Sequence, residues 1–174
     1  MKKNKVKRLW EQGKPAVMGW CSTGNPYIAE LMAHADYDAI LIDWQHGIGV
    51  TQSSVLACLQ AIGTTDTTPI VRVPWNEPMY IQYALDAGAY GVLVPMVNNA
   101  DDAARAGLAC RYAPDGARSV GFNRPALSGG LNKYIAEANK EIICPVMIET
   151  QEALDQVEEI AKAPQIDGLY IGPS

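Results

Sequence analysis

The stretch ILIDWQHG, residues 40–47, joins a short apolar run to a group of polar side chains. The apolar part is continuous rather than alternating, which is typical of a strand buried on both faces of a parallel sheet. Asp43, Gln45 and His46 follow at once. Because chargeable groups beside a buried segment are costly without a partner, we interpret this stretch as a strand that delivers polar residues to a shared cavity.

The same pattern recurs along the chain. The predicted strands cover residues 16–20, 39–43, 69–73, 91–95, 145–149 and 168–172. Amphipathic stretches between them predict helices over residues 26–35, 51–62, 78–88, 99–112, 131–142 and 150–163. This alternation predicts an α/β fold with a parallel sheet covered by helices.

Two architectures fit this alternation, a closed (β/α)8 barrel and an open doubly wound sheet. No G-x-G-x-x-G follows the first strand, so the dinucleotide-binding version of the open sheet loses support. A closed barrel typically has eight strands in ~250 residues, whereas this chain shows six in 174 residues. We expect residues 1–174 to form one domain.

Composition excludes several classes of protein. A net charge of -5 argues against binding to nucleic acid. No apolar run reaches membrane-spanning length, and no apolar segment follows the basic MKKNKVKR to make a signal peptide. We expect those lysines to form a solvated tail or an oligomer contact. The four cysteines form no C-x-x-C pair, which argues against a zinc site or a disulfide framework. Free cysteines of this kind favour a location in the reducing cytoplasm.

Chargeable side chains gather at the carboxyl ends of separate predicted strands. In a barrel these ends lie around one opening, where active sites are found. Arg72, inside PIVRVPW, needs an anionic ligand or a carboxylate partner. Glu149 needs a cation, which a metal or Arg72 could supply. His46 follows Asp43 by three residues, so an Asp43–imidazole contact could orient the ring. An ordinary loop histidine and a helix-capping Asp43 are the structural alternatives.

The lysines favour one kind of chemistry. None of them lies in a predicted strand or at the carboxyl end of one, whereas a Schiff-base mechanism needs a desolvated lysine there. If the site carries out carbanion chemistry, a divalent cation must stabilise the enolate instead. Oxygen ligands favour Mg²⁺ or Mn²⁺, with Co²⁺ and Zn²⁺ as further candidates.

Several stretches together resemble the metal-dependent pyruvate aldolases of the HpcH/HpaI family. They are AELMAHADYDAILIDWQHG, PIVRVPWNEP, ALDAGAYGVLVPMVNNADDA, RYAPDGARSVG, VMIETQEALDQVEEI and IDGLYIGPS. The resemblance implies a (β/α)8 TIM barrel of the phosphoenolpyruvate/pyruvate superfamily. It also implies reversible cleavage of a 4-hydroxy-2-oxo acid to pyruvate and an aldehyde, by a homo-oligomer that is often hexameric.

The resemblance also implies roles for single residues. Glu149 looks like a metal ligand. Arg72 looks like the group that binds the carboxylate and keto oxygen of the substrate and stabilises the enolate. His46, supported by Asp43, looks like part of the acid/base machinery.

A substrate-binding role is implied for the backbone of Gly172 and Ser174, and we expect Trp20, at the end of the first strand, to line the same site. Gln45 stands where many family members have an acid. That departure leaves open a decarboxylating carbon–carbon bond-forming reaction of the macrophomate synthase kind. The family continues after GPS with an Asp that is a second metal ligand and two further βα units, so we expect a truncated barrel or one that another chain completes.

Two further alternatives stay open. A citrate-lyase-like acyl-CoA lyase would need basic residues for the CoA phosphates, and Arg111, Arg118 and Arg124 are the available candidates. A non-catalytic truncated barrel acting as an assembly subunit is the alternative outside enzymes.

Overall fold

The computed structural model describes residues 1–173, with the side chain of Ser128 left out of the description. One sheet contains, in this order, β1 (Met18–Cys21), β2 (Ala39–Asp43), β3 (Thr68–Arg72) and β4 (Gly91–Leu93). A second pair consists of β5 (Pro145–Ile148) and β6 (Gly168–Ile171). All pairings are parallel, and bridges at Gly91–Ile143 and Val94–Val146 join β4 to β5. The six predicted strands are confirmed, with ends shifted by at most two residues.

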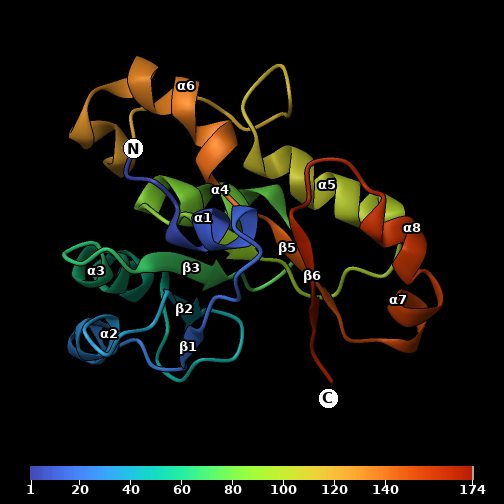
Figure 1. The fold of residues 1–174 in the computed structure, drawn as a ribbon, viewed down its shortest axis with the longest axis horizontal. Coiled ribbons are helices and arrows are strands. Elements are labelled where there is room, and N and C mark those ends of the chain that lie inside the picture. Colours follow the sequence, from blue (N-terminus) through green and yellow to red (C-terminus); the bar gives the residue numbers. More distant parts are fainter. Residues whose placement is uncertain (174) are drawn as a thin grey trace.

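Helices lie around the outside of this strand array (Figure 1). They are α2 (Pro26–Ala33), α3 (Gln52–Ile62), α4 (Pro78–Ala87), α5 (Ala100–Cys110) and α6 (Leu131–Glu141), with a 3-10 turn at Arg124–Ser128. Thr51 accepts a hydrogen bond from the Ser54 N–H and so caps α3. Gly88, with a φ of 113°, ends α4 in the left-handed region. No helix in residues 1–173 is long and apolar enough to cross a lipid bilayer.

The predicted helix over 150–163 consists of two short helices, which corrects its extent. They are α7 (Gln151–Asp155) and α8 (Val157–Ala161). Gln156 separates them, because its ψ of 14° departs from helical backbone. The amphipathic pattern continues through Gln156, so the pattern alone predicts one uninterrupted helix.

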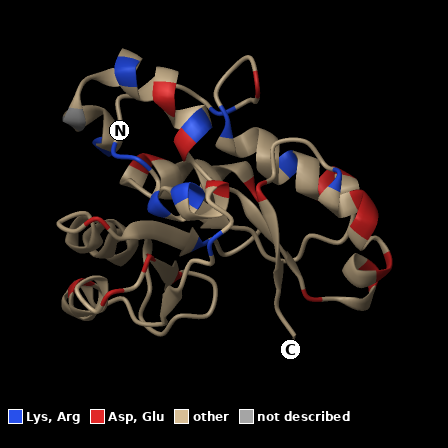
Figure 2. Ribbon diagram, viewed as in Figure 1, with Lys and Arg blue, Asp and Glu red and all other residues tan. Residues whose placement is uncertain are grey.

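The prediction that the basic N-terminal segment forms a solvated tail is wrong, because this segment packs against the rest of the fold. Residues Lys5–Glu11 form α1. Asn4 is fully buried, and its Nδ2 donates to the carbonyl oxygens of Tyr90 at 3.1 Å and Glu141 at 2.7 Å. The Glu141 carboxylate accepts hydrogen bonds from Lys3 and Arg8. Figure 2 shows acidic and basic residues close together around α1 and α6.

Two layers of apolar packing account for the continuous hydrophobicity of the strands. One cluster lies on the concave side of the strands and contains Val6, Ala39, Leu41, Ile70, Leu93, Ile143 and Met147. The other cluster fills the space between the strands and the helices and includes Ile40, Ile42, Val71, Val92, Leu59 and Ile81. Since successive residues of a strand face opposite sides, both faces are buried, as in a (β/α) barrel. The side chain of Val6 brings α1 into the concave layer.

Candidate functional site

Asp43 and Arg72 point to the same side of the strands as the apolar residues that precede them by two positions. Asp43 lies two residues after Leu41 on β2, and Leu41 belongs to the concave cluster. Arg72 likewise lies two residues after Ile70 on β3. Because side chains two apart share a face, both polar groups reach the concave side at the carboxyl ends of their strands.

Asp43 and Arg72 form a buried, bidentate ion pair. They are register partners on β2 and β3. Arg72 Nε donates to Asp43 Oδ1 at 2.8 Å, and Nη2 donates to Oδ2 at 2.6 Å. Asp43 is 2% exposed and Arg72 9% exposed. The partner that a buried guanidinium requires is therefore Asp43, and a planar fork–fork geometry fixes the orientation of both groups.

Trp20 contacts both members of this ion pair. Its indole N–H donates to Asp43 Oδ2 at 3.3 Å, and the guanidinium carbon of Arg72 lies 4.9 Å from the centre of the ring. The other neighbour of the indole is Tyr170 on β6, with ring centroids 5.7 Å apart. The structure thus brings together three of the predicted site residues from three adjacent strands.

These contacts set the charge of Asp43. Burial by itself raises the pKa of this carboxyl, but the hydrogen bonds from Arg72 and from the backbone N–H of His46 outweigh it, and the pKa is lowered. Asp43 therefore stays ionised and neutralises Arg72. The remaining terminal nitrogen, Nη1, takes no part in the bond to Asp43, so it is the donor suited to a ligand.

The turn after β2 places His46 in an unexpected way. The contact with Asp43 is made by the His46 backbone N–H, which donates to Oδ1 at 3.1 Å, and the imidazole is exposed. The structure does not show the predicted orientation of the ring by Asp43, because the two carboxylate oxygens already accept two hydrogen bonds each, from Arg72, Trp20 and the His46 N–H. The Gly47 N–H donates to the Asp43 carbonyl at 3.1 Å and closes the turn. A Cβ at Gly47 would overlap that carbonyl, so glycine is required there.

Gln45 carries an unused acceptor in the same turn. Its Oε1 is buried and has no hydrogen-bond partner within the described residues. A buried amide oxygen without a partner costs about 1–3 kcal/mol. It is an acceptor suited to a hydroxyl or amide of a bound molecule.

Glu149 stands at the end of β5, two residues after Met147 of the concave cluster. Its Oε1 accepts the backbone N–H of Met96 at 2.7 Å. The alternative in which Arg72 pairs with Glu149 is not the arrangement observed, since Arg72 bonds to Asp43. No role could be assigned to Met96 from sequence, because its contribution is a backbone N–H.

Gly172 and Ser174 are the two predicted substrate-binding residues near the C-terminal end of the sequence. The Gly172 N–H donates to the Ile148 carbonyl at 3.1 Å, so this amide is used in the pairing of β5 and β6. A Cβ on Gly172 would lie 3.7 Å from the Glu149 Cβ, which places the glycine beside the acid. Ser174 lies outside the described residues.

The donor set fits a hard divalent cation held by few protein ligands. Within residues 1–173, no three His, Cys, Asp or Glu side chains come together as a metal cluster. Mg²⁺ commonly uses one or two carboxylates and completes its coordination with waters and substrate oxygens. Glu149 has one oxygen that Met96 does not use, so it suits such a site.

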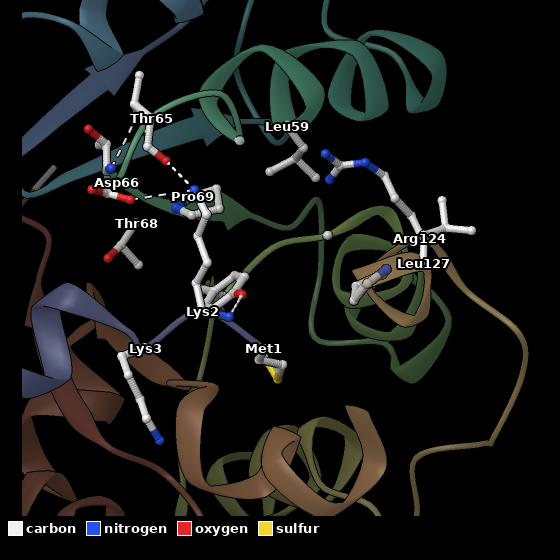
Figure 3. A pocket seen from close by; sticks show the side chains of 15 residues that line it. Met1, Lys2, Lys3, Leu59, Thr65, Asp66, Thr68, Pro69, Arg124 and Leu127 are labelled. Atoms are coloured by element: carbon white, nitrogen blue, oxygen red, sulfur yellow. Dashed lines mark hydrogen bonds and ion pairs between the residues drawn. The ribbon is translucent and has the colours of Figure 1, made fainter. Parts of the chain in front are cut away.

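A separate cavity of about 230 Å³ lies at the opposite ends of the strands (Figure 3). Arg124 and Lys2 line it, together with Pro69 near the start of β3. Arg124 donates to the Ala87 carbonyl at 3.1 Å, at the end of α4, where a cation is favoured. The cavity contains none of the predicted site residues.

The arginines weighed for a CoA site are used inside the fold. Arg111 pairs with Asp167 at 2.6 Å. Arg118, whose side chain is fully buried, pairs with Asp86 at 2.7 Å. With Arg124 bonded to a helix end, all three have structural partners, and the structure gives no support to a phosphate-binding role for them.

Comparisons with known proteins find similar sequences among the aldolases. A hydroxypyruvate/pyruvate aldolase of Rhizorhabdus wittichii is 42% identical over 171 residues, covering 98% of this chain and 67% of that protein. A 4-hydroxy-2-oxo-heptane-1,7-dioate aldolase of Salmonella dublin is 40% identical over 174 residues, covering 99% and 66%. The chain thus spans about two thirds of the length of these relatives.

A solved structure and a family model give the same result. The crystal structure of an HpcH/HpaI aldolase/citrate lyase family protein from Burkholderia cenocepacia superposes with a TM-score of 0.89 at 35% identity, covering 98% of this chain and 69% of that one. The family model for HpcH/HpaI aldolase/citrate lyase matches residues 16–174. With this match over most of its length and these relatives, the chain belongs to the HpcH/HpaI aldolase/citrate lyase family.

Proposed function

We propose that the protein is a divalent-metal-dependent aldolase that cleaves a 4-hydroxy-2-oxo acid reversibly to pyruvate and an aldehyde. The observation that carries this proposal is the buried Asp43–Arg72 pair at the mouth of the strand array. The names of the relatives, which act on hydroxypyruvate, pyruvate or a 4-hydroxy-2-oxo dioate, support the substrate class.

Arg72 binds the substrate in this proposal. Asp43 occupies Nε and Nη2, so the guanidinium is held in one plane before the ligand arrives and Nη1 donates to the 2-oxo acid. Such a fixed donor costs little reorganisation as negative charge grows on the C2 oxygen. Trp20 stacks on the guanidinium and excludes water from one side.

The bond cleavage requires one proton to leave and one to arrive. A base takes the proton of the C4 hydroxyl, the C3–C4 bond breaks, and its electron pair forms the enolate of pyruvate while C4 becomes the aldehyde carbonyl. Protonation of C3 then yields pyruvate. The exposed imidazole of His46, held at the mouth through its backbone N–H, is the proposed group for these transfers.

Glu149 would hold the divalent cation, for which we propose Mg²⁺ or Mn²⁺. When bound, the ion supplies a Lewis acid that stabilises negative charge on the keto oxygen. Small 2-oxo acids and aldehydes are the proposed partners. Assembly as a homo-oligomer and a cytoplasmic location are further parts of the proposal.

The alternative of a purely structural subunit is less compatible with the buried ion pair. Replacing such a pair by apolar side chains is often neutral or stabilising. Apolar side chains could fill the concave layer of a barrel that binds no ligand equally well, so the pair favours a ligand-binding role.

Hydrogen exchange of the pyruvate methyl group in D₂O tests the proposal. The full polypeptide is incubated with pyruvate and Mg²⁺ or Mn²⁺, and the methyl signal is followed by proton NMR before and after EDTA is added. Metal-dependent loss of the signal is expected, because enolate formation exchanges those hydrogens. A folded, metal-loaded sample without exchange would contradict the proposed aldolase.

A further inference from the structure

The loop after β4 makes the one hydrogen bond to the Glu149 carboxylate that is found among the described residues. Met96 has a φ of 55°, a left-handed backbone that residues other than glycine rarely adopt. Its N–H donates to Glu149 Oε1 at 2.7 Å. The other oxygen, Oε2, has no part in this bond.

A second hydrogen bond joins the same loop to Thr150, the residue that follows Glu149. The Thr150 hydroxyl donates to Asn98 Oδ1 at 2.6 Å. The same hydroxyl accepts the Ala153 N–H at 3.0 Å and so caps α7. Glu149 and Thr150 are thus both held by residues 96–98, one through a backbone donor and one through a side-chain acceptor.

The loop is itself anchored to its neighbours. The Asn98 N–H donates to Asp102 Oδ2 at 3.3 Å in the first turn of α5. Asn76, which follows β3 and is 1% exposed, donates through Nδ2 to the Asp102 carbonyl at 2.9 Å. Hydrogen bonds therefore link the loops after β3, β4 and β5 in series.

These contacts are not needed to keep β4 and β5 together. The backbone already joins them, since the Val94 N–H donates to the Pro145 carbonyl and the Met147 N–H donates to the Val94 carbonyl. A left-handed methionine is a conformational cost that this pairing does not require. Costs of this kind cluster where a site must be held in one geometry.

We infer that Met96 and Asn98 are positioning residues that hold Glu149 in a single orientation, with Oε1 occupied and Oε2 free for a divalent cation. This inference rests on the proposed function, in which Glu149 is a metal ligand. The part played by Met96 belongs to its backbone and not to its side chain. Partners of this kind orient metal ligands, and their loss typically weakens metal affinity by ~10–100-fold.

A matched pair of substitutions separates backbone from side chain. Met96→Gly removes the side chain but keeps the N–H and favours the left-handed backbone. Met96→Val keeps an apolar side chain but disfavours that backbone, because it is β-branched. Asn98→Ala removes the acceptor of Thr150 and leaves the cap of α7 in place.

The measurement is the affinity of the full polypeptide for Mn²⁺ alone, followed by the electron paramagnetic resonance signal of the free ion. Glu149→Gln defines the level without the site. We expect Met96→Gly to bind within about twofold of wild type, and Met96→Val and Asn98→Ala to bind ~10-fold or more weakly, with the thermal midpoint of Asn98→Ala close to wild type. If Met96→Val does not fold, Asn98→Ala and Met96→Gly decide the question.

The outcomes separate this inference from the proposed function. Wild-type affinity in Asn98→Ala, or a loss in Met96→Gly, would overturn the positioning role while leaving the metal site intact. Absence of binding that depends on Glu149 in the wild type would overturn the metal site and the positioning role together.

Discussion

At the scale of single residues, the site depends on which side chains pair. The sequence places Asp43, Arg72 and Glu149 at strand ends, and that placement is what the structure shows. The pairing itself could not be predicted, because it depends on the register of β2 against β3. A contact made by a backbone N–H, such as that of His46 to Asp43, leaves no mark in residue types.

Replacing Arg72 by Lys tests its role at this scale. A lysine cannot keep two parallel hydrogen bonds to Asp43 and still present a donor to the substrate. We expect kcat/KM for aldol cleavage to fall by ~100-fold or more. Arg105→Lys is the control, since Arg105 is half exposed and pairs with Asp102 within one turn of α5. Activity near wild type in Arg72→Lys would remove Arg72 from the mechanism.

Asp43→Asn tests the ion pair through stability. It leaves the Arg72 charge buried without a counterion, so we expect the free energy of unfolding at pH 7 to fall by about 3–5 kcal/mol. Because the pKa of Asp43 is lowered on folding, its stabilisation is present above the unfolded pKa of ~3.9 and is lost as the pH falls through the folded pKa.

Urea unfolding between pH 3 and pH 7 checks both parts of this prediction. The variant should lose less stability than wild type on acidification. Asp66→Asn, at a side chain that is 97% exposed, is the control and should behave as wild type does. An acid response in Asp43→Asn equal to that of wild type would show that the pair does not contribute.

At the scale of elements, strands were easier to predict than helices. Each strand is an unbroken apolar run because both of its faces are buried. Helix α1 was missed because KVKRLWE is mostly polar and is held by few groups, chiefly Val6 and the flanking Asn4. The break at Gln156 also has no sequence signal, since the apolar spacing continues across it.

Asn4→Ala tests how firmly α1 is held. The substitution removes the cap of α1 and leaves the carbonyl oxygens of Tyr90 and Glu141 without this donor. We expect the free energy of unfolding in urea to fall by about 1–3 kcal/mol. Lys14→Ala, at an exposed position, is the control. Equal stability of the two variants would mean that the N-terminal segment behaves as the solvated tail expected from its charge.

At the scale of the whole molecule, the two ends of the strand array differ in chemistry. The amino ends are covered by α1 and by apolar packing around Val6, whereas the carboxyl ends carry Asp43, Arg72 and Glu149. Its two sides end in β1 and β6, each of which pairs with one strand in the described part of the chain. A strand edge of this kind can pair with another chain.

The edge at β6 leads to a prediction about residues 1–174 expressed alone. Ile171 is 65% exposed on this strand. We expect this polypeptide to self-associate with rising concentration, and Ile171→Lys to reduce that association, because a charge on an edge strand opposes pairing. Sedimentation velocity at two concentrations checks it. Identical distributions for the two proteins would exclude β6 as the contact.

The contacts that anchor the segment before α1 join residues that are far apart in the sequence. Asn4 bonds to Glu141, and the N-terminal amine of Met1 bonds to Glu137, across more than 130 residues of chain. Residues 1–4 can therefore reach these native contacts only after α6 has been synthesised. Contacts so distant in sequence form slowly. We therefore expect the segment that contains Asn4 and α1 to dock onto the strand array late in folding.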